Sequence, residues 1–270
     1  MQRVMPDSLI DLRERTIFIT GSGGVLGSTY VRRMLAAGAR VIATDLPGHR
    51  AEALQASHST NPGFRFYALD VADEEQVSGI FQRTLADGWR PNVVLNNAAI
   101  TGELLMGAGK PFPDFADTSL TDWERTLRTN LTGSFLVARQ MDRDLVGCGP
   151  VTLINVASMY ALNGPHHAIY EGMPFKSFSA YSTTKAGLHG LTLWLAGYWA
   201  DRGATVNTIA PGAVLNGHTE EFQRRVGELI MLKRMAQPDE IADAMLFLCS
   251  TAAGYMTGQL VNVDGGFSGW

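Results

Sequence analysis

Short runs rich in β-branched and aromatic residues alternate with longer amphipathic stretches along almost the whole 270-residue chain. Alternation of strands with helices favours a parallel sheet covered on both faces, and apolar runs suit strands that are buried on both sides. The runs occupy residues 16–20, 40–44, 64–69, 92–97, 151–156, 205–210 and 259–264. Helical stretches include residues 25–37, 74–87, 121–146, 181–201 and 238–250. We therefore expect an α/β fold with a doubly wound parallel sheet and helices on both faces.

No linker-like segment, internal repeat or low-complexity tract divides the chain, so we expect residues 1–270 to form a single domain. Two segments resemble long loops: residues 101–120, rich in Gly, Pro and Phe, and residues 160–178, which contain two Gly and two Pro. Long loops in a compact α/β domain are more often functional than idle. Surface decoration is the alternative interpretation.

Composition and charge exclude several classes of function. With 46% hydrophobic and 18% charged residues the chain can bury a full core, and a net charge of −4 without a Lys or Arg run disfavours a nucleic-acid or anionic-membrane partner. No apolar stretch reaches the length of a membrane span, and the first residues lack the apolar core of a signal peptide, so we expect a cytoplasmic location. Cys148 and Cys249 are far apart and the six His include no HExxH, so we expect free thiols and no metal.

A glycine-rich turn, GSGGVLG, follows the first run and opens the first helix. In this context glycines let backbone N–H groups approach a pyrophosphate, and the helix N-terminus supplies partial positive charge, although any strand-to-helix turn can use glycines. Asp45 ends the second run, where a carboxylate can accept hydrogen bonds from the adenosine ribose. The same carboxylate would repel a 2′-phosphate. No Arg or Lys lies within the turn, though Arg50 follows Asp45 by five residues, so we expect NAD and not NADP.

The stretch AYSTTKAG places Tyr181 and Lys185 four residues apart, on one side of an expected helix. One interpretation is a polar helix face on which the two residues happen to be neighbours. The other is that the ammonium lowers the pKa of the phenol from its usual value of about 10, so that the phenol can move a proton near neutral pH.

Taken in order, these motifs resemble the short-chain dehydrogenase/reductase family over nearly the whole chain. The turn from Thr20-Gly21 to Gly27 is similar to that family's TGxxxGxG, although Val25 stands where the middle glycine is usual. Further similar motifs are Asp70-Val71 after the third run, Asn96-Asn97-Ala98-Ala99 after the fourth, Asn130 in RTNLTGSF, Ser158 in NVASMYA, Tyr181 with Lys185, Pro211-Gly212 with Val214 nearby, and TGQLVNVDGG.

The resemblance implies a single Rossmann-type domain with seven parallel strands, NAD as cofactor and a homotetramer. It implies that the cofactor is contacted by Gly21, Gly24, Leu26, Gly27, Asp45, Asp70, Val71, Asn97, Tyr181, Lys185, Pro211 and Val214. Within this set, Asp70-Val71 would contact the adenine and Val214 would lie near the nicotinamide carboxamide.

The resemblance also implies a catalytic set of Asn130, Ser158, Tyr181 and Lys185. A secondary alcohol that becomes a ketone loses a hydride to the nicotinamide and a proton to a base. The Lys185 ammonium and the positive nicotinamide ring would favour the Tyr181 phenolate. Ser158 would hold the substrate oxygen, and Asn130 would fix a water that connects Lys185 to solvent. The alternatives are a turn serine, a mid-helix asparagine and a surface lysine.

Ser158 and Tyr181 are 23 positions apart, whereas about a dozen is common in the family, so the chain carries roughly ten extra residues between two catalytic groups. This loop and the run PGAVLNG resemble bacterial oxidoreductases of flagellin glycosylation and sugar-acid metabolism. We therefore expect a polyhydroxylated, sugar-like substrate. Residues 161–178 would form one wall of its pocket, or else a subunit contact. The expected substrate contacts are Ser158, His167, Tyr170 and Glu171.

Residues 212–232 are expected to form a mobile lid. Gly212 and Gly217 can absorb backbone change, and residues 217–230 have the pattern of an amphipathic helix. Two other functions remain open. An NADPH-dependent reductase of acyl or lipid carbonyls is disfavoured by Asp45 and the polar loop. A non-catalytic NAD(H)-sensing protein is disfavoured because a sensor needs no proton relay.

Overall fold

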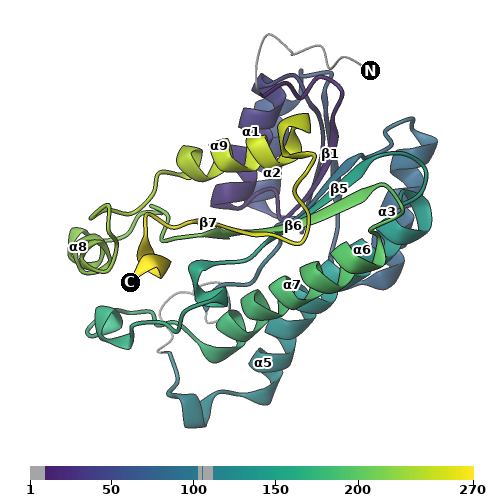
Figure 1. Ribbon diagram of the computed structural model, residues 1–270. Helices are drawn as coiled ribbons and strands as arrows, with labels where there is room; N and C mark the ends of the chain where they lie inside the picture. Colours follow the sequence, from purple (N-terminus) through teal and green to yellow (C-terminus); the bar gives the residue numbers. More distant parts are fainter. Residues whose placement is uncertain (1–9, 103–104, 106–111) are drawn as a thin grey trace.

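The computed structural model describes residues 10–102, 105 and 112–270, and in this part of the chain seven strands form one parallel sheet (Figure 1). The strand order is β3-β2-β1-β4-β5-β6-β7. The strands are β1 (Thr16–Thr20), β2 (Arg40–Asp45), β3 (Phe64–Ala68), β4 (Val93–Asn96), β5 (Val151–Val156), β6 (Ala204–Pro211) and β7 (Leu260–Val263). Each predicted run corresponds to one strand, which confirms the expected doubly wound sheet.

Helices cover both faces of the sheet. They are α1 (Val25–Ala36), α2 (His49–His58), α3 (Glu74–Ala86), α5 (Leu120–Leu127), α6 (Gly133–Asp144), α7 (Ser179–Tyr198), α8 (Glu220–Glu228) and α9 (Pro238–Cys249). Figure 1 shows α1, α2 and α9 on one face and α3, α6 and α7 on the other. Each face has its own apolar core, with Met34 and Met245 in the first and Phe81 and Met141 in the second. Burial on both faces explains why the five central strands are almost continuously apolar, whereas the edge strands β3 and β7 are only partly buried.

The strand order places the site. From β1 the chain builds outward to β2 and β3, then returns to β4 on the other side of β1 and continues to β7. The loops that leave β1 and β4 therefore diverge at the carboxyl ends of neighbouring strands. In open α/β sheets the crevice at this switch point is where ligands bind.

Several elements differ in detail from the predicted ones. The stretch 121–146 is not one regular helix, because a π-helical turn, η2 (Arg128–Thr132), separates α5 from α6. The helix α2 is absent from the predicted set. In the predicted loop 101–120, residues 103–104 and 106–111 lie outside the described residues, and the remainder includes a short 3-10 turn at Phe115–Asp117. No helix in the described part is both long and apolar enough to cross a bilayer.

Candidate active site

The glycine turn after β1 is packed so closely that two of its residues can only be glycine. Gly21 has a φ of +64°, and a Cβ there would lie 2.6 Å from Cα of Ala98. A Cβ on Gly27 would lie 2.2 Å from the carbonyl oxygen of Gly21. The turn therefore lies directly against the end of β4 and the start of α1, the close packing that a dinucleotide turn needs.

Side chains from β1 and β4 hold this turn in place. The Asn97 amide donates to the carbonyl oxygens of Thr20 and Gly21, both at 2.9 Å. The Thr20 hydroxyl accepts hydrogen bonds from the backbone N–H groups of Asn97 and Ala98, both at 3.0 Å. Asn97 was expected to contact the cofactor, and the structure shows it bracing the turn that would bind the cofactor.

The first turn of α1 fits an anionic group. Gly24 is the N-cap residue, no side chain caps the helix, and its first turn carries no acidic residue. The positive end of the helix dipole is therefore open to a pyrophosphate. Leu26, the third predicted contact in this turn, is partly buried and packs against the first core.

Asp45, at the end of β2, borders the same turn. One of its carboxylate oxygens accepts a hydrogen bond from the Gly23 N–H at 2.6 Å, and the other accepts one from the Leu46 N–H at 2.7 Å. A Cβ on Gly23 would lie 3.0 Å from the Asp45 carboxylate and 3.2 Å from Cβ of Arg50. An acidic and a basic residue thus both adjoin the position expected for the adenosine ribose.

The remaining predicted cofactor residues lie at the same edge of the sheet. The Asp70 carboxylate accepts a hydrogen bond from the Ala72 N–H at 2.9 Å, and Val71 is buried. Pro211 ends β6, and Val214 forms a parallel bridge with Ala236. Contact between these residues and a cofactor stays a prediction.

Ser158, Tyr181 and Lys185 come together at the carboxyl end of β5. Ser158 caps the 3-10 turn η3 (Met159–Ala161), and its hydroxyl lies close enough to the Tyr181 phenol to favour the phenolate. Tyr181 and Lys185 lie in the first two turns of α7, and the Lys185 ammonium is 5.6 Å from the centre of the Tyr181 ring. Lys185 is 3% exposed and donates to the carbonyl oxygen of Val156 at 2.7 Å. Lys185 is therefore buried beside Tyr181 and is not a surface charge, and its effect on the pKa of the phenol stays a prediction.

Burial changes both protonation equilibria. It raises the pKa of the Tyr181 phenol, and the nearby Ser158 hydroxyl acts against that rise. Burial also lowers the pKa of Lys185 to about 8. The sequence expectation attributed the lowering of the phenol pKa to Lys185 and a bound nicotinamide. In the chain alone desolvation outweighs other effects, and Ser158 is the neighbour that favours the phenolate.

Asn130 is fully buried in the π-helical turn η2. Its side-chain oxygen accepts a hydrogen bond from the Ile100 N–H at 2.7 Å, and its amide donates to the Ile100 carbonyl oxygen at 3.1 Å and to the Thr184 hydroxyl at 3.3 Å. Asn130 thus links the loop after β4 to α7. Its contact on α7 is Thr184, the residue before Lys185. Irregular turns of this kind often occur at functional sites. The predicted water next to Asn130 stays a prediction.

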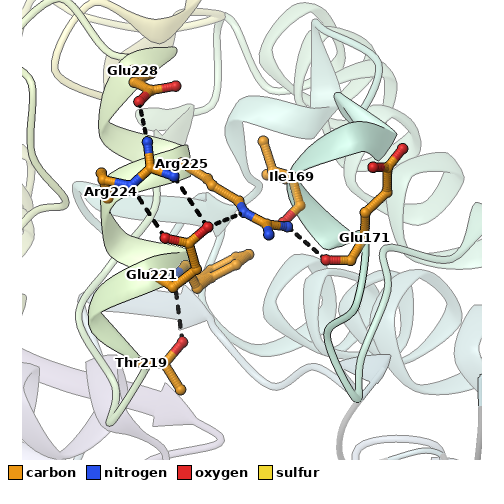
Figure 2. A network of polar contacts seen from close by, with 8 residues as sticks. Ile169, Glu171, Thr219, Glu221, Arg224, Arg225 and Glu228 are labelled. Carbon is orange, nitrogen blue, oxygen red and sulfur yellow. Dashed lines mark hydrogen bonds and ion pairs between the residues drawn. The ribbon is translucent and has the colours of Figure 1, made fainter.

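The loop 161–178 packs against the predicted lid. Ile169 and Tyr170, in the 3-10 turn η4 (His167–Tyr170), share an apolar cluster with Phe222 and Val226 of α8. Figure 2 shows the polar contact between the two segments: Arg225 of α8 donates to the carbonyl oxygen of Glu171 at 2.6 Å. The loop 161–178 and the predicted lid, which are separate in the sequence, are therefore packed against each other.

The predicted substrate contacts divide into two groups. Tyr170 is half-buried, and its hydroxyl is 2.7 Å from that of Tyr160. The side chains of His167 and Glu171 are exposed. Tyr160 was not among the predicted site residues, although its position two residues after Ser158 placed it at the end of the same strand.

Comparison with known proteins agrees with this geometry. The profile of the family described as enoyl-(acyl carrier protein) reductase matches residues 24–268. A 3-oxoacyl-(acyl-carrier-protein) reductase of Aquifex aeolicus is 33% identical over 95% of this chain and 98% of its own length. A D-threitol dehydrogenase of Mycolicibacterium smegmatis is 32% identical over 99% and 98%.

Solved structures resemble the whole chain. A short-chain dehydrogenase of Leptospira borgpetersenii with bound NAD+ superposes with a TM-score of 0.86, 26% identity, and coverage of 99% of this chain and 98% of that one. A gluconate 5-dehydrogenase of Burkholderia cenocepacia, in complex with NADP and tartrate, gives 0.83, 25%, 97% and 98%. Because the family profile and the relatives match the chain almost from end to end, the chain belongs to the short-chain dehydrogenase/reductase family of oxidoreductases.

Proposed function

We propose that the protein is an NAD-dependent dehydrogenase/reductase that interconverts a secondary alcohol and a ketone on a sugar-like, polyhydroxylated substrate. The observation that carries the reaction type is the position of Tyr181 beside the buried Lys185 and close enough to Ser158 for that hydroxyl to favour the phenolate. These residues lie at the end of β5, which is separated from β1 and its glycine turn by β4. This arrangement supports a proton-transfer role for Tyr181 next to the predicted nicotinamide position.

The bound nicotinamide supplies the hydride acceptor or donor. Tyr181 takes the hydroxyl proton in oxidation and returns it in reduction, which requires the phenolate to be accessible near neutral pH. The Ser158 hydroxyl lies near the phenol, so it can hold the substrate oxygen at the same point while the charge on that oxygen changes. Lys185, held by Val156, supplies positive charge next to the phenol.

The proposed preference for NAD depends on Asp45. Its carboxylate, bonded to the Gly23 N–H, stands where a 2′-phosphate would meet negative charge. Arg50 lies beside the same turn and would favour NADP, so the balance between the two residues decides the preference.

Replacement of single residues tests this balance. Asp45→Asn keeps an acceptor for Gly23 and removes the charge, and we expect it to narrow the preference for NAD by roughly tenfold, mainly through a higher kcat/KM with NADP. Arg50→Ala should have the opposite effect. A parent enzyme with a higher kcat/KM for NADP than for NAD would contradict the proposal.

The sugar-like substrate is supported by the likeness to a D-threitol dehydrogenase and by the polar residues of the loop 161–178. The second candidate, reduction of acyl carbonyls, is supported by the family profile and by the Aquifex aeolicus relative. Assays with NAD or NADP distinguish the candidates when polyols, sugar acids and sugar phosphates are compared with an acetoacetyl thioester. Higher kcat/KM for the thioester would favour the second candidate, and NADH binding without any turnover would favour a sensing protein.

A further inference from the structure

Two tyrosines form a hydrogen-bonded pair next to the proposed reaction centre. Tyr160 lies in η3, two residues after Ser158. Tyr170 lies in η4, within the loop 161–178 that is longer than is common in the family. Their hydroxyl oxygens are 2.7 Å apart. The pair exists because the loop folds back across the end of β5.

The pair has one proton to spare. Two phenols carry two hydroxyl protons, and the bond between them uses one. Within the part of the chain that the structure describes, neither hydroxyl has another hydrogen-bond partner. Burial raises the pKa of both phenols, so both keep their protons at neutral pH. A phenol that accepts one hydrogen bond is also a stronger donor of the next.

The spare donor lies close to the reacting groups. The Tyr160 N–H donates to the Ser158 hydroxyl at 3.2 Å, and that hydroxyl lies close enough to Tyr181 to lower the pKa of its phenol. Tyr181 also lies near enough to Tyr170 that a charge on one phenol would raise the pKa of the other. The pair is therefore a neighbour of the oxygen position that Ser158 and Tyr181 define.

Apolar rings surround and orient the pair. The Tyr170 ring packs against Phe175 and Phe222, at centroid distances of 6.1 and 5.7 Å, and the Tyr160 ring meets Phe267 edge-on at 6.2 Å. The two hydroxyls are thus polar groups held among apolar rings. A donor fixed in this way favours a ligand that places an oxygen opposite it and rejects one that leaves it unpaired.

We propose that the Tyr160–Tyr170 pair determines specificity by hydrogen-bonding an oxygen on the carbon next to the reacting carbon. The site then selects vicinal diols and their α-hydroxy ketones over isolated secondary alcohols. This inference rests on the proposed oxidoreductase function and deepens it, because it assigns the selection for polyols to two named hydroxyls.

The test compares two four-carbon substrates, threitol and butan-2-ol, in the parent enzyme and in the variants Tyr160→Phe and Tyr170→Phe. Both variants keep the ring and remove one hydroxyl. We expect each to lower kcat/KM for threitol by roughly tenfold and to leave that for butan-2-ol within about twofold. The ratio between the substrates is the readout, because a general loss of structure lowers both values together.

Tyr255→Phe is the matched control, since Tyr255 is fully exposed and the same hydroxyl is removed there. NADH titration and urea unfolding of each variant report on the cofactor site and on folding. An unchanged ratio with active variants would overturn the role of the pair and leave the proposed function standing. A parent enzyme that oxidises neither alcohol, nor any polyol in the substrate screen, would contradict the proposed function and the role of the pair with it.

Discussion

At the residue scale, the proposed chemistry depends on the Tyr181 phenol, which lies in α7 beside Lys185 and near the Ser158 hydroxyl. Replacing Tyr181 by Phe removes the proton-transfer group and keeps the ring. We expect a loss of turnover of at least about a hundredfold, with NADH affinity within a few-fold of the parent. Steady-state kinetics and NADH fluorescence titration measure the two effects. Turnover within a few-fold of the parent would remove Tyr181 from its proposed role.

Lys185 makes stability depend on pH in a predictable direction. Its pKa is about 8 in the native state and 10.5 in the unfolded chain, so between these values the unfolded state binds more protons. The free energy of unfolding of the parent should therefore rise relative to that of Lys185→Met as the pH increases above 8. Below pH 8 Lys185 is charged in both states, so the free-energy cost of burying its ammonium is fully present.

Urea unfolding of both proteins at pH 7, 8 and 9.5 measures this change without substrate. The highest pH stays below the range in which Tyr181, with its raised pKa, begins to ionise. Lys176→Met is the control, because Lys176 is exposed. A difference between parent and Lys185→Met that does not vary from pH 7 to 9.5 would show that burial does not lower the pKa of Lys185.

At the scale of elements, η4 and α8 hold each other. Arg225 bonds to the carbonyl oxygens of Glu171, at 2.6 Å, and Ile169, at 3.4 Å, while its own helix supplies the partner Glu221 (Figure 2). Whether the segment 212–232 moves as a lid stays a prediction. The packing predicts that any opening carries both segments together.

Arg225→Ala tests this coupling. We expect backbone amides of η4 and of α8 to exchange with solvent roughly tenfold faster, because the contact between the elements is lost. Arg224→Ala is the matched control: Arg224 also pairs with Glu221 and pairs with Glu228 on its own helix. Hydrogen exchange followed by mass spectrometry measures both variants. Equal effects of the two substitutions, or faster exchange in α8 alone, would contradict coupled opening.

At the scale of the whole molecule, α7 presents an apolar outer face. Leu193, Trp194 and Tyr198 are each more than half exposed, and the rings of Trp194 and Tyr198 are stacked at 4.8 Å. Contiguous exposed apolar side chains often mark a protein–protein contact. We expect this face to be covered in the predicted homotetramer, with a native mass four times the chain mass of 29.3 kDa.

Native mass spectrometry of the parent and of Trp194→Glu checks the assembly. The substitution should reduce the mass to that of a smaller species, because a charge would be buried at the contact. Tyr255→Glu, on a fully exposed side chain that belongs to none of these elements, should leave the mass unchanged. A monomeric parent would exclude the homotetramer.

Periodicity and motif order predicted most of the fold. Strands buried on both faces leave a continuous apolar signal, and the seven runs were located within one or two residues, including the partly buried edge strands β3 and β7. The helix α2 has no comparable signal, because only Ala51 and Leu54 are buried in it. The π-helical turn at Asn130 was also not predictable, since it inserts into a helix whose periodicity looks regular on either side.

For the site, the sequence by itself determined the residues that the chain needs at short range. The glycines of the turn, Asp45 at the end of β2, and the pairing of Tyr181 with Lys185 all follow from local geometry. Tertiary structure alone decided which residues from distant segments contact one another around the site. Tyr160 meets Tyr170, and Arg225 meets Glu171, because separate loops converge at the carboxyl ends of the strands. Contacts between distant segments depend on how those loops pack on one another, and no local pattern of residues encodes that packing.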